Sequence, residues 1–190
     1  MSPPRGRAAV GAALVAAAVG CAAPGPGRAR EGAGVEARAP LVGSPGPAIE
    51  RPVVAGDGRG AQLDWSSLRG HVTVVDFWAT WCWPCRQSMP YLQALADRDP
   101  AALRVVGVSE DDTEASIPEF ARRYAVRFPL VWDDDRGIAQ AYRVTGLPTT
   151  VVLDPDGVVR EMRAGFRSSD AGKLEARIRE LGALETVVPE

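Results

Sequence analysis

The sequence predicts an α/β domain with a mixed central β-sheet and helices on both faces of that sheet. Apolar, β-branched segments alternate with helical segments between residues 72 and 142, which is typical of parallel βαβ units. Two later strand segments, 151–153 and 158–163, flank an Asp-Pro-Asp-Gly turn, which predicts an antiparallel hairpin. A Cys-X-X-Cys pair at 82–85 follows the first apolar segment and predicts a redox site.

Composition limits the possible functions. The chain has 190 residues, of which 46% are hydrophobic and 24% charged, as in an ordinary globular protein. Its formal net charge is −2 and no strongly basic domain stands out, which argues against nucleic acid as a partner. The one histidine, His71, stands just before a strand, where we expect it to be exposed and without a catalytic role.

Residues 1–21 have the features of an export signal. Two arginines precede an uncharged run of small apolar residues at 8–19, which is too short to span a bilayer comfortably. The segment ends in Ala-Val-Gly-Cys, which resembles a bacterial lipoprotein box, although leucine is usual where Ala18 stands. This resemblance implies that Cys21 is lipidated and anchors the protein to a membrane, outside the cytoplasm. An ordinary secretory signal, in which Cys21 is incidental, is the alternative.

A tether and the start of the folded domain are expected next. Residues 22–48 are rich in Ala, Gly, Pro and Arg and have few large apolar side chains, so we expect them to be disordered. The folded domain is expected at 49–185. It should open with a short hairpin, 49–54 with 61–63, around a glycine-rich turn, and continue with a single helical turn closed by Gly70.

The central strands and the first helix are predicted from local patterns. Residues 72–78 and 103–109 are continuous apolar runs, which predict buried strands, and 128–132 predicts a third. The helix after the first strand is expected at 82–97, with a kink at Pro90, because proline removes a backbone hydrogen bond.

Three further helix starts are predicted from capping patterns. Residues 116–119 fit a capping box. The three aspartates at 133–135 could suggest a metal site, but they lack the spacing of a calcium loop, so a solvated start of a short helix is favoured. Residues 168–170 are expected to cap a last helix whose apolar face includes Leu174 and Ile178.

Two motifs carry a resemblance to a known family. Residues 75–86, Val-Asp-Phe-Trp-Ala-Thr-Trp-Cys-Trp-Pro-Cys-Arg, resemble the active-site segment of the thioredoxin superfamily, and Gly-Leu-Pro-Thr at 146–149 resembles its cis-proline loop. The N-terminal hairpin and the strand–helix insertion at 103–128 resemble the TlpA/ResA-type, membrane-tethered, extracytoplasmic thiol-disulfide oxidoreductases. The resemblance covers 49–183 and implies a thioredoxin fold.

The Cys-X-X-Cys pair predicts dithiol chemistry. We expect Cys82 to be the nucleophile, because unpaired N–H groups at a helix N-terminus stabilise a thiolate and lower its pKa. Cys85, one turn further on, would resolve the mixed disulfide and leave a Cys82–Cys85 disulfide, so no other cofactor is expected. Trp83 and Pro84 are expected to tune the reduction potential and to contact substrate. A zinc site would need a second pair of ligands, and a structural disulfide across so small a loop would constrain little.

The resemblance also implies roles for residues around the two cysteines. Asp76 matches the buried acid of thioredoxin that helps deprotonate the resolving cysteine, and burial would raise its pKa. Pro148 is expected in cis, so that the backbone of Leu147 can pair with an extended substrate chain. Trp81 and Trp83 are expected to form an apolar docking surface beside the sulfur atoms.

The leading hypothesis is a reductase of protein disulfides outside the cytoplasm, supplied by a membrane thiol-disulfide electron donor. Cytochrome c maturation is one role in this branch, but the branch usually carries glutamate where this chain has Ser88, which leaves that client in doubt. A thiol-dependent peroxidase is the alternative; its pattern would need proline in place of Val75 and threonine in place of Ala79. A non-catalytic binding domain is a third class, and the two intact cysteines count against it.

Overall fold

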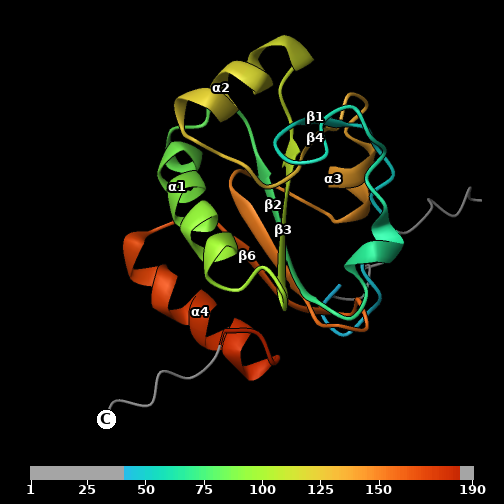
Figure 1. Ribbon diagram of the computed structural model, residues 1–190, viewed down its shortest axis with the longest axis vertical. Coiled ribbons are helices and arrows are strands. Elements are labelled where there is room, and N and C mark those ends of the chain that lie inside the picture. The colour runs from blue at the N-terminus through green and yellow to red at the C-terminus, as the bar shows by residue number, and fades with distance from the viewer. Residues whose placement is uncertain (1–40, 185–190) are drawn as a thin grey trace, which may run out of the picture. The chain divides into compact units, whose positions relative to one another are not determined.

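The computed structural model describes residues 41–184, and Figure 1 shows their arrangement. They form a six-stranded sheet in the order β1-β4-β3-β2-β5-β6. The strands are β1 (Val53–Ala55), β2 (Val72–Trp78), β3 (Leu103–Ser109), β4 (Leu130–Trp132), β5 (Thr149–Leu153) and β6 (Val159–Ala164). The α-helices are α1 (Trp83–Arg98), α2 (Ile117–Arg123), α3 (Gly137–Ala141) and α4 (Ala171–Glu180). The predicted export signal, Cys21 and the tether up to residue 40 lie outside the described residues.

Strand β2 is the centre of the sheet. It pairs in parallel with β3 and antiparallel with β5, and all seven of its residues are buried. Because side chains alternate along a strand, Val74 and Trp78 pack in the cluster that includes α1, α2 and α4, whereas Val75 and Phe77 pack in the cluster that includes α3. Figure 1 shows α1 and α4 on one side of the sheet and α3 on the other. The predicted α/β fold, with a mixed sheet covered on both faces, is confirmed.

The predicted N-terminal hairpin is only partly regular. Its first arm becomes β1, which joins the edge of the main sheet antiparallel to β4. Its second arm forms no strand, but it is bonded to the first: the N–H of Val53 donates to the carbonyl of Ala61 at 2.9 Å, and the N–H of Leu63 donates to Arg51 at 3.0 Å. The backbone N–H and C=O groups on the outer side of β1, which would face solvent in an isolated hairpin, are therefore paired with β4.

The folded domain begins earlier than residue 49, which corrects the predicted end of the tether. The N–H of Gly43 donates to the carbonyl of Val159 at 2.8 Å, and the N–H of Gly46 donates to Gly157 at 2.9 Å. The hydroxyl of Tyr142 donates to the carbonyl of Pro47 at 2.7 Å. These bonds fasten residues 43–47 to the turn between β5 and β6, at the end of the sheet where β2 begins.

The predicted side-chain caps are absent at α2 and α4, whereas the predicted helix start at the three aspartates is confirmed with one correction. A 3₁₀ turn at 114–116 leads into α2, so the Ser116 backbone is already helical and its hydroxyl donates to Thr113 instead of capping the helix. Helix α4 begins after a similar turn at 168–170 and has no side-chain cap. Asp133, expected in solvent, is buried, and its two oxygens accept the N–H groups of residues 138 and 139 at the start of α3.

Two glycines of the turn after β1 provide a test of local packing. Gly56 and Gly58 both have positive φ, of 84° and 79°, but a Cβ atom at Gly56 would collide with the backbone of Phe128, whereas one at Gly58 would meet open space. We expect Gly58→Ala to cost about 1 kcal/mol of unfolding free energy, from backbone strain alone. Gly56→Ala is expected to cost about 2 to 4 kcal/mol, because β1 must also move away from Phe128. Urea unfolding of both variants measures the difference; equal losses would contradict the predicted collision.

Candidate active site

The cysteine pair lies where β2 ends and α1 begins. The chain turns after Trp78, the N–H of Cys82 donates to the carbonyl of Ala79 at 3.1 Å, and Cys82 becomes the N-cap residue of α1. Its Sγ accepts the N–H of Cys85 at 3.3 Å and is joined to Cys85 in a disulfide. Cys82 is 5% exposed and Cys85 is fully buried. Only Cys82 can therefore meet a substrate first, as its predicted role as nucleophile requires.

The loop before Cys82 is held by a buried carboxylate. Asp111 accepts the backbone N–H of Thr80 at 3.1 and 3.0 Å, its hydroxyl at 2.6 Å and the hydroxyl of Ser109 at 2.8 Å. The Arg86 guanidinium donates twice to the carbonyl of Thr80, at 3.1 and 2.9 Å. These bonds fix the residue two positions before Cys82, and so fix the direction in which the chain enters α1.

A groove of about 530 Å³ runs past the cysteine pair. The residues that line it are Trp81, Cys82, Trp83, Pro84, Glu110, Arg136, Ala139, Gln140, Val144, Thr145, Gly146 and Leu147. The bond between Leu147 and Pro148 is cis, as predicted. Pro148 is buried, and Leu147 lines the groove. The motif and the cis-proline loop are therefore the two sides of one groove.

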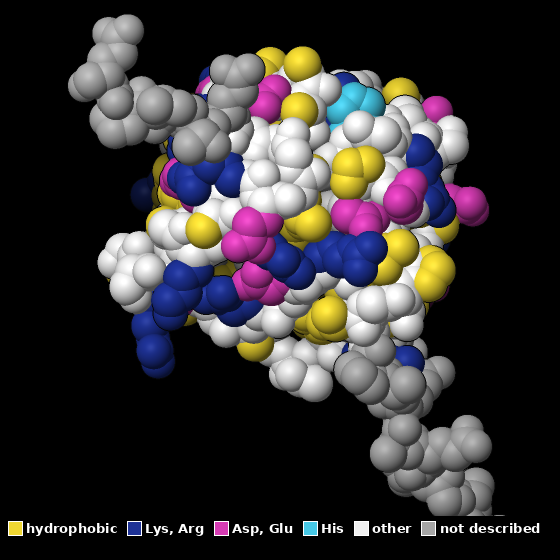
Figure 2. Space-filling model, turned by 90° about the horizontal axis from the view of Figure 1, so that it is seen from below, with side chains coloured by type: hydrophobic (Ala, Val, Ile, Leu, Met, Phe, Trp, Pro, Cys, Tyr) yellow, Lys and Arg dark blue, Asp and Glu magenta, His cyan; other side chains and the backbone are white. Residues whose placement is uncertain are grey.

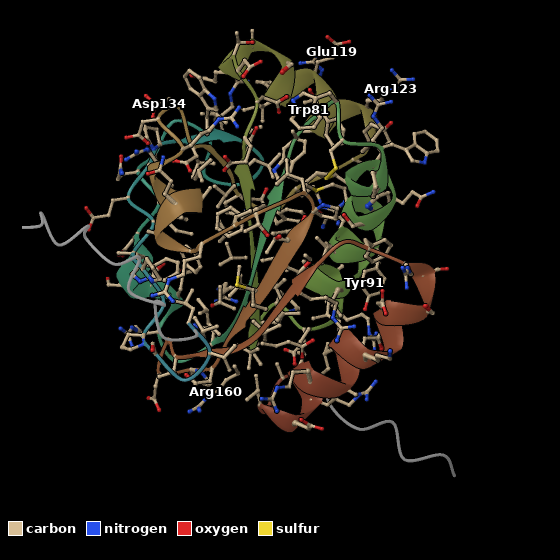
Figure 3. All side chains as sticks on the ribbon, turned by 180° about the vertical axis from the view of Figure 1, so that it is seen from behind. Trp81, Tyr91, Glu119, Arg123, Asp134 and Arg160 are labelled. Atoms are coloured by element: carbon tan, nitrogen blue, oxygen red, sulfur yellow. A yellow bond between two sulfur atoms is a disulfide. The ribbon has the colours of Figure 1, made fainter. Side chains whose placement is uncertain are left out.

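The two tryptophans beside Cys82 point outward. Trp81 is 61% exposed and Trp83 is 66% exposed, which makes them the most exposed large apolar side chains of the described residues. Figure 3 shows Trp81 between the start of α1 and α2, which carries Glu119 and Arg123. Exposed indole rings cost solvation free energy unless a partner covers them, so they suit a surface that docks other chains.

Asp76 lies inside the domain, as predicted. It is fully buried, its Oδ1 accepts the Thr150 hydroxyl at 2.7 Å, and its Oδ2 has no partner. Alternation along β2 places its side chain on the same face as Val74, toward the cluster that contains Cys85. Burial raises the pKa of Asp76 to about 7, although the Thr150 hydroxyl lowers it. An acid with this pKa can accept and release a proton near neutral pH.

A second buried acid, Glu110, was not among the predicted site residues. It directly follows β3, is 5% exposed, and lines the groove that contains Cys82. The sequence suggested only that the acidic residues at 110–112 close the strand. A usable signal was present: β2 and β3 are parallel, so a residue that follows β3 reaches the same edge of the sheet as the Cys-X-X-Cys motif.

Other predicted residues lie apart from the site or contribute packing. Ser88 is buried in α1, where its hydroxyl donates to the carbonyl of Cys85 at 3.1 Å, so it provides no acid there. Pro90 lies within α1, as predicted. His71 lies at the opposite end of β2 from Cys82; it is half-buried instead of exposed, and its Nε2 is 3.0 Å from Arg104.

The surface charges are mixed. Figure 2 shows a face on which Lys and Arg side chains lie among Asp and Glu side chains, and exposed pairs such as Arg127 with Asp97 and Arg177 with Glu180 are of this kind. Within residues 41–184, no group of three or more His, Cys, Asp or Glu side chains is arranged to hold a metal ion. No helix in this part of the chain has the length and hydrophobicity to cross a membrane.

Comparisons with known proteins agree with this geometry. The family model for the AhpC/TSA family matches residues 42–162. The thiol-disulfide oxidoreductase ResA of Geobacillus kaustophilus is 33% identical over 118 residues, 62% of this chain and 68% of the relative. The ResA of Bacillus subtilis is also 33% identical, over 113 residues, and this match spans 63% of that relative's length.

Solved structures give the same picture. A Chlorobium tepidum structure described as a thiol:disulfide interchange protein DsbE is 31% identical, with a TM-score of 0.64 over 74% of this chain and 96% of the other. A secreted Mycobacterium tuberculosis disulfide oxidoreductase, homologous to E. coli DsbE, is 26% identical, with a TM-score of 0.58 over 70% of this chain and 96% of the other.

Fold and site together define a class: a thioredoxin-fold protein with a Cys-X-X-Cys disulfide beside a cis-proline loop. Within that class, the chain belongs to the AhpC/TSA family and is of the TlpA/ResA type.

Proposed function

We propose that the protein reduces disulfide bonds of other proteins outside the cytoplasm. The observation that carries this proposal is the shared groove, in which Cys82 of the oxidised pair faces the cis-proline loop at Leu147. An extended substrate chain can pair with the Leu147 backbone while its disulfide lies over Cys82. The named ResA and DsbE relatives are consistent with this chemistry.

The reaction uses the two sulfur atoms in sequence. The Cys82 thiolate attacks one sulfur of the substrate disulfide, forms a mixed disulfide and releases the first substrate thiolate. Cys85 gives its proton to Asp76 and attacks Cys82, which breaks the mixed disulfide and releases the second substrate thiolate. The protein is left oxidised, as in the structure, and a membrane thiol-disulfide donor returns it to the dithiol.

The proposed location follows from the N-terminal sequence. The export signal would bring the domain across the membrane, and lipidation of Cys21 would then hold it on the membrane surface. The description of the Mycobacterium tuberculosis relative as secreted supports a location outside the cytoplasm. Labelling with a radioactive fatty acid, compared between the natural chain and Cys21→Ser, tests the anchor; equal labelling of both would contradict it.

An insulin assay tests the proposed activity. With dithiothreitol as electron donor, the natural chain is expected to accelerate precipitation of the insulin B chain, because Cys82 attacks the interchain disulfides. Cys82→Ser is expected to reduce the rate to that of dithiothreitol alone. Arg127→Ala, which changes an exposed ion pair away from the groove, is the matched control and is expected to keep the full rate. Insulin reduction that survives Cys82→Ser would rule out the proposal.

The same samples separate the peroxidase alternative. A peroxidase pattern needs proline and threonine where this chain has Val75 and Ala79, so the chain lacks those two groups beside Cys82. We expect hydrogen peroxide to be consumed no faster than by a free thiol at the same concentration. Consumption far above that rate, with insulin reduction absent, would support a peroxidase.

A further inference from the structure

Glu110 is a buried acid for which the reaction described above has no use. Its N–H donates to the carbonyl of Trp78 at 2.8 Å, which ties the end of β3 to the end of β2 just ahead of the cysteine motif. Its side chain is 5% exposed, and its Oε1 is buried without a hydrogen-bond partner. The residue nevertheless lines the groove together with Cys82. A polar atom that is buried and unpaired carries a desolvation cost, and a catalytic role is one reason why such an atom is retained.

The surroundings of Glu110 favour its protonated form. Asp133 lies beside it, and the two oxygens of Asp133 accept the N–H groups of Ile138 and Ala139 at 3.1 and 2.8 Å. Burial, and then the charge of Asp133, raise the pKa of Glu110 to about 7, while Arg136 acts in the opposite direction. Glu110 can therefore donate a proton near neutral pH.

We propose that Glu110 is the acid that protonates the substrate thiolates released in the groove beside Cys82. This inference rests on the proposed reductase function and adds a residue to it. When the sulfur–sulfur bond to the substrate breaks, the leaving sulfur takes its electron pair and becomes a thiolate next to Cys82. The Glu110 carboxyl group transfers its proton to that sulfur, directly or through one water molecule, and becomes a carboxylate. The product is a neutral substrate thiol, and water in the groove returns a proton to Glu110.

Each reacting sulfur would then have its own acid. Asp76 faces the buried side of α1, where Cys85 must lose a proton, and Glu110 faces the groove, where the substrate must gain one. The charged groups around Glu110 are Asp133, Arg136 and, beyond Asp133, Arg51, whose Nη2 is 3.9 Å from the Asp133 carboxylate. Asp112, on the same loop, points to solvent and pairs with Arg136 at 3.3 Å. Arg136 is near enough to stabilise the carboxylate that Glu110 becomes.

Two disulfides with different leaving groups test the proposal in the full-length reduced protein. Bis(2-hydroxyethyl) disulfide releases an alkyl thiolate that needs a proton, whereas 2,2′-dithiodipyridine releases a weakly basic thiolate that does not. Near pH 7, Glu110→Gln is expected to slow oxidation of the protein by the alkyl disulfide about 10-fold. Oxidation by the pyridyl disulfide should stay within about 2-fold of the natural chain. Asp112→Asn, which removes an exposed acid from the same loop, is expected to match the natural chain with both reagents.

The pH dependence of the two rates is a second test of the proposal. Glu110 acts as the protonated acid, so the rate with the alkyl disulfide should fall as the pH rises through about 7, relative to the rate with the pyridyl disulfide. In Glu110→Gln this fall should be absent. Equal slowing with both reagents, or no difference between their pH profiles in the natural chain, would overturn the role of Glu110. Reaction of Cys82→Ser at the natural rate, after subtraction of the rate of the Cys82→Ser, Cys85→Ser double variant that keeps only Cys21, would overturn the reductase function itself.

Discussion

Replacing Cys85 with serine is expected to leave Cys82 covalently joined to its substrate. Cys82 can still attack a disulfide, since it is the cysteine of the pair that lines the groove, but the buried thiol that resolves the mixed disulfide is gone. Attack by a neighbouring group can correspond to an effective molarity of about 10⁵ M, so its loss should lengthen the life of the mixed disulfide by orders of magnitude. Non-reducing electrophoresis and mass spectrometry after mixing with insulin measure the adduct.

Two controls make this result specific. Cys82→Ser retains Cys85, which is fully buried, and is expected to form almost no adduct. The double variant, Cys82→Ser with Cys85→Ser, keeps only Cys21 and reports any adduct at that residue. A stronger adduct in Cys82→Ser than in Cys85→Ser would reverse the assigned roles of the two cysteines.

Replacing Asp76 with asparagine is expected to stabilise the oxidised protein at alkaline pH. Burial raises the pKa of Asp76 from 3.8 to about 7, so between these values the folded state holds a proton that the unfolded state has lost. The free energy of unfolding therefore falls as the pH rises through this window, and the full cost is present above about pH 7. A shift of about three pKa units corresponds to about 4 kcal/mol, and asparagine avoids most of that cost because it is neutral.

Urea unfolding at two pH values measures the effect. Asp76→Asn is expected to exceed the natural chain by about 2 to 4 kcal/mol near pH 8.5, and to match it below about pH 4, where Asp76 is neutral in both states. Asp154→Asn is the control, because the pKa of Asp154 is lowered in the folded state and the expected change in stability has the opposite sign. Burial acts against its charge, but the N–H of Val158 and the Arg160 guanidinium hold the pKa of Asp154 below 3.8. That variant should lose stability at neutral pH. A loss in both variants would contradict the assigned pKa of Asp76.

The same substitution should slow the reaction. Asparagine cannot accept the Cys85 proton, so resolution of the mixed disulfide must wait for water to remove it. We expect insulin reduction by Asp76→Asn to fall by about 10² at neutral pH, although the protein is more stable. A higher free energy of unfolding together with slower insulin reduction in this variant would show that the buried Asp76 carboxyl group lowers stability but is needed for the reaction.

The sequence allowed much of this site to be predicted because its main signals are local. Strand β2 reads as buried from seven consecutive residues, and the position of Cys82 at a helix start depends only on the residues beside it. The cis bond before Pro148 could not be predicted from the proline alone, since most X-Pro bonds are trans. It was predicted from the resemblance of two motifs to the same family.

What escaped prediction depends on contacts between distant segments. Asp111 and Glu110 look like surface acids in the sequence, and only the folded sheet encloses them, with Glu110 at the groove. Asp133 likewise reads as a solvated helix start, but its carboxylate is enclosed against α3. The capping box at 116–119 failed for a different reason: the 3₁₀ turn at 114–116 had already set the Ser116 backbone, which took its side chain away from the helix amides.

The attachment of residues 43–47 to the turn between β5 and β6 has a mechanical consequence. That turn lies at the end of β2 where the strand begins, and Cys82 follows the end where the strand finishes. Under the proposed anchoring at Cys21, a pull on the chain would therefore act at the end of the domain opposite to the groove. Clients in the surrounding solution would meet the groove without reorientation of the domain.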